Sequence, residues 1–241
     1  MIKLLLRMSQ PTTSLIQNVI GDIGHIAELL KDRSRIGKVA VVNAANAHLL
    51  PGGGVTGALV RSVGGSQTWM ELVKDAKLID GKPFNSKKGL QLGQVAWTDV
   101  AGQLEKDDVF AIIHTRGPVA FQDDIATISD VITNTLSMAD HLGIETLILP
   151  AISGGIFAAG DPEWPIKIRK LIRESIKDYF KHHFSSLEHV YLISYDENDQ
   201  QLWFRSSLAI RESSPATGES SPATGESSLA TKEPKKQDKS A

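Results

Sequence analysis

Two glycine-rich stretches of this chain combine the residue types that hold phosphate groups. The first carries two asparagines, Asn43 and Asn46, followed by the triplet Gly52, Gly53 and Gly54 and then by Val55. Glycine lets a backbone approach a ligand closely, and a helix that begins after such a loop offers unpaired N–H groups to an anion. The stretch therefore predicts a phosphate cradle with two amide side chains at its rim.

A second stretch repeats this design far along the chain. The apolar run Thr146–Leu149 ends at Pro150, and the turn Ser153, Gly154 and Gly155 follows, with Ile156 and Phe157 after it. Ligands of open α/β sheets bind outside the carboxyl ends of the strands, where two such loops can lie side by side. Two facing cradles suit a diphosphate better than a single phosphate. The alternatives are that the glycine triplet is only a flexible turn and that the asparagines satisfy loop backbone.

Strands that alternate with helices must position these loops. Apolar runs predict strands at 2–6, 15–20, 39–42, 94–98, 109–114, 146–149 and 190–193, and helical spacing predicts helices from Ile23, over 55–63, 68–78 and 125–139, and after Asp161. The lysine-rich segment 80–93 reads as a surface loop. This alternation predicts a layered α/β domain.

Bulk composition excludes several classes of protein. The chain has 241 residues, 41% of them hydrophobic, with a net charge of −2 and no cysteine. It therefore lacks the basic field expected of strong nucleic-acid binding, and thiol or disulfide chemistry is excluded. No apolar run reaches the length of a membrane span. We expect a cytoplasmic, reducing location, a monomer, no membrane contact, and no metal or cofactor.

The composition changes after Leu208. Ser213–Glu219 recurs as Ser220–Glu226 and, imperfectly, as Ser227–Glu233. The repeat has almost nothing apolar to bury, so we expect a disordered tail over 209–241 behind a folded domain over 1–208. A role of this tail in export is conceivable from its composition alone.

Several motifs together resemble the macrodomain family, over about residues 2 to 205. They are Gly21-Asp22-Ile23, Asn43-Ala44-Ala45-Asn46 with its glycine triplet, Ile113-His114-Thr115-Arg116-Gly117-Pro118, and Pro150 to Phe157. The stretches 52–59 and 190–196 are most similar to the viral type. The resemblance implies an α/β/α fold with a mixed, six-stranded sheet, and ADP-ribose or ADP-ribosylated proteins as partners.

The resemblance also assigns the site. Asp22, with Ile23, matches the aspartate that accepts a hydrogen bond from the adenine amino group, and Tyr195 matches an aromatic that packs on adenine. The diphosphate loops match Gly52, Gly53, Gly54 and Val55, and Ser153, Gly154, Gly155 and Ile156. Asn46 matches the asparagine that holds the distal ribose, Asn43 supports the same rim, and Phe157 lies beside that ribose. Asn46, Gly54 and Gly155 are the residues assigned to catalysis.

Other interpretations of these residues stay open. Asp22 is also suited to cap a helix, and Phe157 to fill a core. His114 lies in an apolar run and reads as a structural histidine rather than a base. A well-known hydrolase branch of the family carries Asp and His where this chain has Thr56 and Val60. Threonine cannot act as a base near neutral pH.

The leading interpretation is a mono-ADP-ribosylhydrolase that acts on modified protein side chains. A non-catalytic reader, an O-acetyl-ADP-ribose deacetylase, an ADP-ribose-1″-phosphate phosphatase and a scaffold for the tail are the alternatives. The completeness of both loops argues against the scaffold. Fold alone does not decide among the others.

Overall fold

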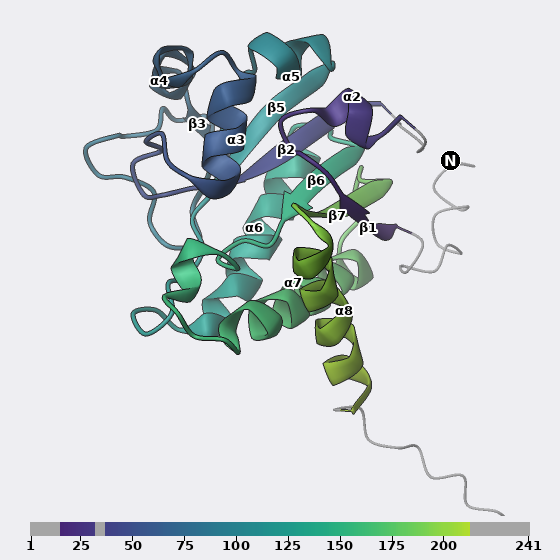
Figure 1. Cartoon of the computed structure of the whole chain (residues 1–241). Helices are drawn as coiled ribbons and strands as arrows, with labels where there is room; N and C mark the ends of the chain where they lie inside the picture. Colours follow the sequence, from purple (N-terminus) through teal and green to yellow (C-terminus); the bar gives the residue numbers. More distant parts are fainter. Residues whose placement is uncertain (1–14, 32–36, 213–241) are drawn as a thin grey trace, which may run out of the picture.

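The structure is a computed structural model that describes residues 15–31 and 37–212, with side chains described as far as Ser207. The expected strand at 2–6 and the repeats from Ser213 lie outside the described residues. A central sheet has helices on both faces, which confirms the predicted α/β/α layering (Figure 1).

The sheet has seven strands in the order β1-β7-β6-β2-β5-β4-β3. The strands are β1 Ile16–Ile20, β2 Val39–Ala44, β3 Lys77–Leu78, β4 Val95–Thr98, β5 Val109–Thr115, β6 Thr146–Pro150 and β7 His189–Ser194. The first five strands of that order are parallel to their neighbours, and β4 and β3 continue the sheet antiparallel. The sheet is mixed, as expected, and it follows that the carboxyl ends of β1, β7, β6, β2 and β5 share one edge.

Strand β2 shows why the apolar runs become central strands. Val39 and Val41 face one layer of helices, whereas Ala40 and Val42 face the other. All four side chains are fully buried. Successive side chains of a strand point to opposite faces, so a run without polar interruption fits a strand that is covered on both sides.

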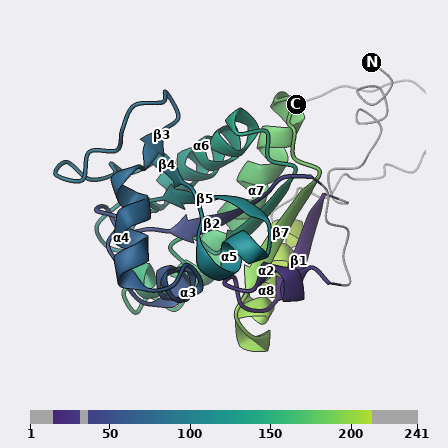
Figure 2. The ribbon, with the colours of Figure 1, turned by 90° about the horizontal axis from the view of Figure 1, so that it is seen from above.

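The helices form two layers. On one face lie α2 Ile26–Leu29, α3 Gly54–Ser62, α4 Ser66–Lys74 and α5 Gly102–Lys106. The other face is covered by α6 Ile128–His141 and α7 Trp164–His182, against which α8 Glu197–Glu212 also packs. Short 3-10 turns η2 Ile125–Thr127 and η3 Ile156–Ala158 complete the elements. Figure 2 shows α6 and α7 on one side of β2 and β5, and α3 and α5 on the other.

Some elements differ from the sequence-based expectation. The sheet has seven strands rather than six, because Lys77 and Leu78 pair with Trp97 and Ala96 as a short edge strand instead of ending a helix. Helix α8 was not predicted, and it crosses the expected domain boundary at Leu208. Its start is fixed by Asp196, whose Oδ1 accepts the Asp199 N–H at 2.8 Å.

No helix in the part of the chain that the structure describes is long and apolar enough to span a membrane.

Candidate ligand-binding site

The predicted site residues lie at the shared carboxyl edge of the parallel strands. Asp22 follows β1, Tyr195 follows β7, the second glycine loop follows β6, and Asn46 with the first loop follows β2. Because the strand order is β1-β7-β6-β2, these features line up along the edge in that sequence. The structure therefore brings together segments that are far apart in the chain, as the crevice argument predicts.

The first glycine loop leads directly into helix α3. Gly53 is its N-cap, and Gly54, with φ of +56°, is its first residue. A Cβ on Gly57 would lie 2.7 Å from the Gly52 carbonyl oxygen, so the loop backbone packs onto the first turn of the helix. The three glycines of the loop are exposed. An open helix N-terminus with bare backbone is suited to bind an anion.

Asn46 closes the segment before this loop. Its Oδ1 accepts the N–H groups of His48, at 3.1 Å, and Leu50, at 3.0 Å, while its Nδ2 donates to the Leu50 carbonyl oxygen at 2.8 Å. Within these contacts the acceptor oxygen is fully used and one N–H of Nδ2 remains. The interpretation that Asn46 satisfies loop backbone is therefore correct for this structure, and Asn46 can offer a ribose one donor but no acceptor.

A buried tryptophan on α4 also holds the segment between Asn46 and the first glycine loop. Leu49 is fully buried and has a φ of +55°, a conformation that a leucine rarely adopts. The buried Nε1–H of Trp69 donates to the Leu49 carbonyl oxygen at 2.7 Å. Asn46 and Trp69 together fix the path of the chain into the first glycine loop.

Asn43 lies beneath the rim rather than at it. Its side chain is fully buried, which corrects its assignment as a ligand contact. Oδ1 accepts the hydroxyl of Thr56 at 2.9 Å, and Nδ2 donates to Nδ1 of His114 at 3.2 Å. These contacts hold the Asn43 side chain inside the domain and tie β2 to the first turn of α3.

His114 continues this buried network as a neutral imidazole. Because Nδ1 accepts from Asn43, the proton resides on Nε2, which donates to Oγ1 of Thr98 at 3.0 Å. Burial lowers the pKa of His114 to about 3, and the ring also makes an edge contact with Trp69, with 5.3 Å between centroids. The structural interpretation of His114 is thus supported by its burial and partners.

The second glycine loop is anchored on its inner side and open on its outer side. Ser153 is buried with a φ of +63°, and its carbonyl oxygen accepts the Nε1–H of Trp164 at 3.1 Å. The Phe157 carbonyl oxygen accepts the Ala120 N–H at 2.8 Å, and its ring is half-buried. Gly155 is exposed and Ile156 is 80% exposed. Gly155 and Ile156, in the middle of the loop, are exposed to solvent, and Ile156 lies beside the first loop.

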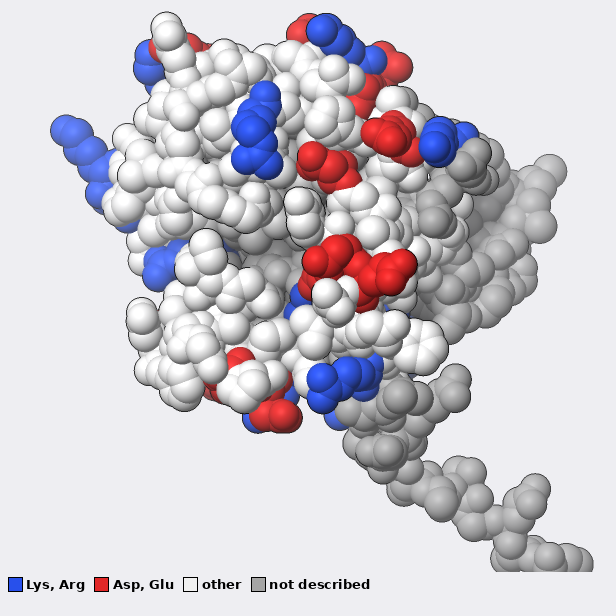
Figure 3. Space-filling model, in the orientation of Figure 1, with Lys and Arg blue, Asp and Glu red and all other residues white. Residues whose placement is uncertain are grey.

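The two loops approach each other closely. A Cβ on Gly53 would lie 3.9 Å from Cδ1 of Ile156. Figure 3 shows acidic side chains gathered near the start of α8 and toward α2, and no broad positive patch among the described residues on this face. An anion between the loops would therefore be bound by local N–H groups rather than by a broad positive field.

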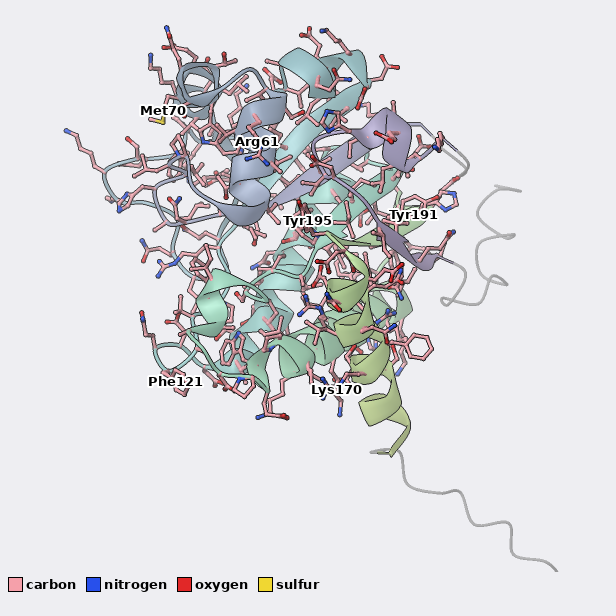
Figure 4. All side chains as sticks on the ribbon, viewed as in Figure 1. Arg61, Met70, Phe121, Lys170, Tyr191 and Tyr195 are labelled. Atoms are coloured by element: carbon pink, nitrogen blue, oxygen red, sulfur yellow. The ribbon has the colours of Figure 1, made fainter. Side chains whose placement is uncertain are left out.

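At the far end of the edge, an acidic side chain and an exposed aromatic follow the adjacent strands β1 and β7. Asp22 Oδ1 accepts the Gly24 N–H at 2.8 Å, and Oδ2 lies 3.4 Å from Nδ1 of His25. An open hollow of about 640 Å³ lies beside Gly21, Asp22 and His25. Tyr195 is 81% exposed on the same face (Figure 4). One oxygen of Asp22 thus holds its own turn, and the other lies beside the His25 ring at the hollow.

Two of the remaining predicted contacts are mostly core residues. The side chain of Ile23 is 5% exposed and lies in the apolar cluster under α2 and α3. Val55 is half-buried and packs against the same cluster. The side chain of Ile23 is thus part of the core, whereas that of Val55 remains partly exposed.

Two arginines near the site were missed from the sequence. Arg61, on α3, is exposed, and its Nη1 lies 3.5 Å from the position of a Cβ on Gly57 (Figure 4). It places a positive charge about one turn from the first loop. Arg169, on α7, lies behind the second loop, with Nη1 at 3.0 Å from the position of a Cβ on Gly154. Neither is marked by a motif, because a helix periodicity alone does not reveal which loop a side chain meets.

Comparisons with known proteins agree with this geometry. The family model described as Macro domain matches residues 42–162. A protein of Thermococcus kodakarensis without an assigned function is 32% identical over 185 residues, which cover 74% of this chain and 97% of that protein. A protein of Escherichia fergusonii named O-acetyl-ADP-ribose deacetylase is 28% identical over 177 residues, covering 72% of this chain and 90% of that one.

Solved structures share the fold at lower identity. The Oceanobacillus iheyensis macrodomain with ADP superposes with a TM-score of 0.63 at 22% identity, covering 84% of this chain and 95% of that chain. The Trypanosoma brucei macrodomain in complex with ADP-ribose gives a TM-score of 0.60 at 20% identity, covering 83% and 72%.

Proposed function

Because this chain belongs to the Macro domain family, we propose that it binds ADP-ribose along the carboxyl edge of its sheet and hydrolyses mono-ADP-ribose from modified protein side chains. The observation that carries the proposal is the close approach of Gly53 and Ile156. It joins two exposed glycine loops at the ends of the adjacent parallel strands β2 and β6. A diphosphate between them would meet backbone N–H groups from both sides.

The order of the edge gives the ligand its direction. Asp22 and Tyr195 lie at the β1–β7 end and would receive adenine, whereas Asn46 and Phe157 lie toward β2 and β6 and would receive the distal ribose. Oδ2 of Asp22 accepts hydrogen bonds only, which suits the exocyclic amine of adenine. Exposed Tyr195 offers an aromatic face for the base.

The hydrolysis we propose is assisted by the substrate. Both loops bend the diphosphate, so that a phosphate oxygen holds a water molecule against the anomeric carbon of the distal ribose. The water oxygen forms the new C–O bond as the bond to the acyl oxygen of the target side chain breaks; the side chain leaves as a carboxylate, and the water gives its proton to the phosphate oxygen that holds it. Positioning and preorganised N–H groups, including those of the Gly54 and Gly155 turns, supply the rate enhancement.

Asn46 contributes mainly by positioning. Its oxygen is committed to His48 and Leu50, so it would orient the ribose with one N–H. Thr56 does not supply a base, because the residue is buried and its hydroxyl donates to Asn43. We infer a slow hydrolase on these grounds.

Two other activities of the same site are separable by experiment. Deacetylation of O-acetyl-ADP-ribose is favoured by the name of the Escherichia fergusonii relative. Non-catalytic recognition of ADP-ribosylated proteins is favoured by the buried hydroxyl of Thr56, which stands where the hydrolase branch has a carboxylate.

The test uses three parallel incubations of the full chain. An auto-ADP-ribosylated transferase measures hydrolysis, O-acetyl-ADP-ribose measures deacetylation, and titration calorimetry with free ADP-ribose measures binding. We expect release of ADP-ribose from the transferase above the rate without enzyme. Binding without release in either incubation would replace the hydrolase with a reader, and the absence of binding would overturn the whole proposal.

A further inference from the structure

Helix α7 carries a buried arginine that lies against the second glycine loop and reaches the backbone of Tyr195 through Asp199. The side chain of Arg169 is 3% exposed. Its Nη1 donates to the Pro165 carbonyl oxygen at 2.9 Å and packs against the backbone of Gly154 in the second loop. A Cβ on Gly154 would lie 2.9 Å from Cβ of Ala151 and 3.0 Å from Nη1 of this guanidinium, so the bare backbone lets the arginine lie close to the loop.

The other branch of the guanidinium reaches helix α8. Nη2 of Arg169 forms an ion pair with Oδ1 of Asp199. Oδ2 of the same carboxylate accepts the N–H of Tyr195 at 3.2 Å. One continuous set of contacts therefore runs from Gly154, through Arg169 and Asp199, to the backbone of Tyr195.

Tryptophan Trp203 holds this assembly in place. The ring is fully buried, and the guanidinium carbons of Arg169 and Arg173 lie 5.4 Å and 5.2 Å from its centroid. Arg173 differs in its partner, since its Nη2 donates to Oδ1 of Asn18 on β1 at 2.7 Å. Thus two arginines share one ring, but only Arg169 contacts the loops of the site.

Burying the charged guanidinium of Arg169 costs free energy, so its position in the fold calls for a physical reason. Burial lowers the pKa of Arg169, and the Asp199 carboxylate only partly opposes this effect. A buried ion pair is on average weak support for stability, whereas a planar guanidinium with several donors is well suited to hold several acceptors in fixed positions. The contacts point to a role in arranging the loops.

We propose that Arg169 is the positioning residue that couples the diphosphate end of the site to the adenine end. Through Gly154 it fixes the second loop, and through Asp199 it fixes the backbone that presents Tyr195. The statement about ligand affinity rests on the proposed function, whereas the mechanical coupling of the two loops does not.

Three variants of the full chain separate this role from general stabilisation. Arg169→Lys keeps the charge but loses the planar fork. Asp199→Asn keeps an acceptor for Tyr195 but removes the ion pair. Arg173→Lys is the matched control, because it makes the same chemical change on the same helix and ring without touching the loops. Circular dichroism establishes that each variant is folded.

The first measurement is amide hydrogen exchange without ligand. We expect Arg169→Lys to exchange about tenfold faster than wild type in peptides covering both 152–158 and 194–200. Asp199→Asn should show the same effect at 194–200, and Arg173→Lys should change neither segment. Unchanged exchange at both segments in Arg169→Lys, or equal acceleration in Arg173→Lys, would overturn the coupling whether or not the protein binds ADP-ribose.

The second measurement is calorimetric affinity for ADP-ribose. We expect about a tenfold loss in Arg169→Lys and in Asp199→Asn, and no loss in Arg173→Lys. Tighter binding in Asp199→Asn would instead show that Arg169 acts as a plain positive charge behind the loop, which would overturn the positioning role. If wild type binds no ADP-ribose, the proposed function fails while the exchange result still decides the coupling.

Discussion

The hydroxyl of Thr56 donates a hydrogen bond to Oδ1 of Asn43 at 2.9 Å, and this contact joins the first turn of α3 to the end of β2. Both residues are buried. The position that carries a carboxylate in a hydrolase branch of the family is therefore occupied here by a structural donor. The contact leads to the first prediction.

Replacing Thr56 should lower stability rather than raise the rate. Thr56→Asp would place a carboxylate against Oδ1 of Asn43 and the carbonyl oxygen of Ala44, the two acceptors of the native hydroxyl. Thr56→Val would leave the buried Oδ1 without its donor. We expect each to cost about 1–3 kcal/mol in the free energy of unfolding, measured with urea.

Thr56→Ser is the control for this change, because it keeps the hydroxyl and should stay within about 1 kcal/mol of wild type. If Thr56→Asp is as stable as wild type and hydrolyses faster, the hydroxyl is not a structural requirement. An aspartate at position 56 would then act in catalysis here as it does in the hydrolase branch.

The buried His114 predicts a specific dependence of stability on pH. Its pKa is lowered to about 3 by burial, from an ordinary value of 6.5. Above pH 6.5 neither state binds a proton at this ring, so its contribution to stability is fully present there. As the pH falls from 6.5 toward 3, only the unfolded state takes up the proton, and stability is lost by up to about 1.4 kcal/mol per pH unit.

The measurement compares urea unfolding of wild type and His114→Gln from pH 7.5 to pH 4. The variant should be less stable at pH 7.5, because it disturbs the bonds to Asn43 and Thr98, but its stability should fall less steeply below pH 6.5. Carboxylates titrate alike in both proteins, so the difference in slope isolates the histidine. Parallel curves would contradict the assignment.

Much of the fold follows from local sequence, but the roles of the two asparagines do not. The runs at β2 and β6 are apolar on both faces, so their burial and their place in a parallel sheet could be predicted. The glycine loops follow these strands directly. By contrast, the partner of Asn43 is His114, which strand pairing brings into register from 71 residues away. No spacing rule distinguishes Asn43 from Asn46.

Helix α8 was missed for a related reason. Of its described side chains, only Trp203 and Ser206 are buried, so its sequence lacks an apolar stripe of the usual width. Its stability depends on Arg169 and Arg173 of α7, which stack on Trp203. These are tertiary contacts. Neither the stacking on Trp203 nor the ion pair between Arg169 and Asp199 can be predicted from helical periodicity.

Asn46 should separate loop closure from catalysis. Asn46→Ala removes the acceptor of the His48 and Leu50 N–H groups and the donor to the Leu50 carbonyl oxygen. We expect hydrolysis to fall by on the order of a hundredfold, stability to fall by about 1–3 kcal/mol, and ADP-ribose affinity to suffer less than the rate. Label release from an ADP-ribosylated protein and urea unfolding measure the two effects.

Asn46→Asp dissects them further, because it keeps the two accepted N–H bonds but removes every donor. We expect stability near wild type with the hydrolytic defect retained. His48→Ala is the neutral control, since its side chain is exposed and contacts the Ser86 carbonyl oxygen outside the site. Full activity in Asn46→Asp would show that Asn46 only shapes the loop.

Asp22 should control adenine recognition through a single oxygen. Oδ1 is bonded to the Gly24 N–H, which leaves Oδ2 for the exocyclic amine. Asp22→Asn retains the turn but halves the acceptor capacity, and we expect ADP-ribose affinity to fall by about 1–3 kcal/mol from a micromolar-scale value. His48→Ala, whose exposed side chain contacts the Ser86 carbonyl oxygen, is the control. Equal affinity of wild type and Asp22→Asn in calorimetry would remove Asp22 from the site.

The end of helix α8 sets where the chain can be shortened. The helix continues to Glu212, four residues beyond the expected boundary at Leu208, and its anchors Trp203 and Ser206 are buried. A chain ending at Glu212 should keep the melting temperature and ADP-ribose affinity of the full chain, because the repeats after it contain almost nothing apolar to bury.

A chain ending at Leu202 should lose several kcal/mol in the free energy of unfolding, about the cost of removing a buried tryptophan. It should also bind ADP-ribose weakly, because Trp203 supports the arginine that fixes the second loop. Thermal unfolding and calorimetry on the two truncations decide the matter: a large loss at Glu212 would show that the repeats dock on the domain, and no loss at Leu202 would show that α8 is not part of the folded unit.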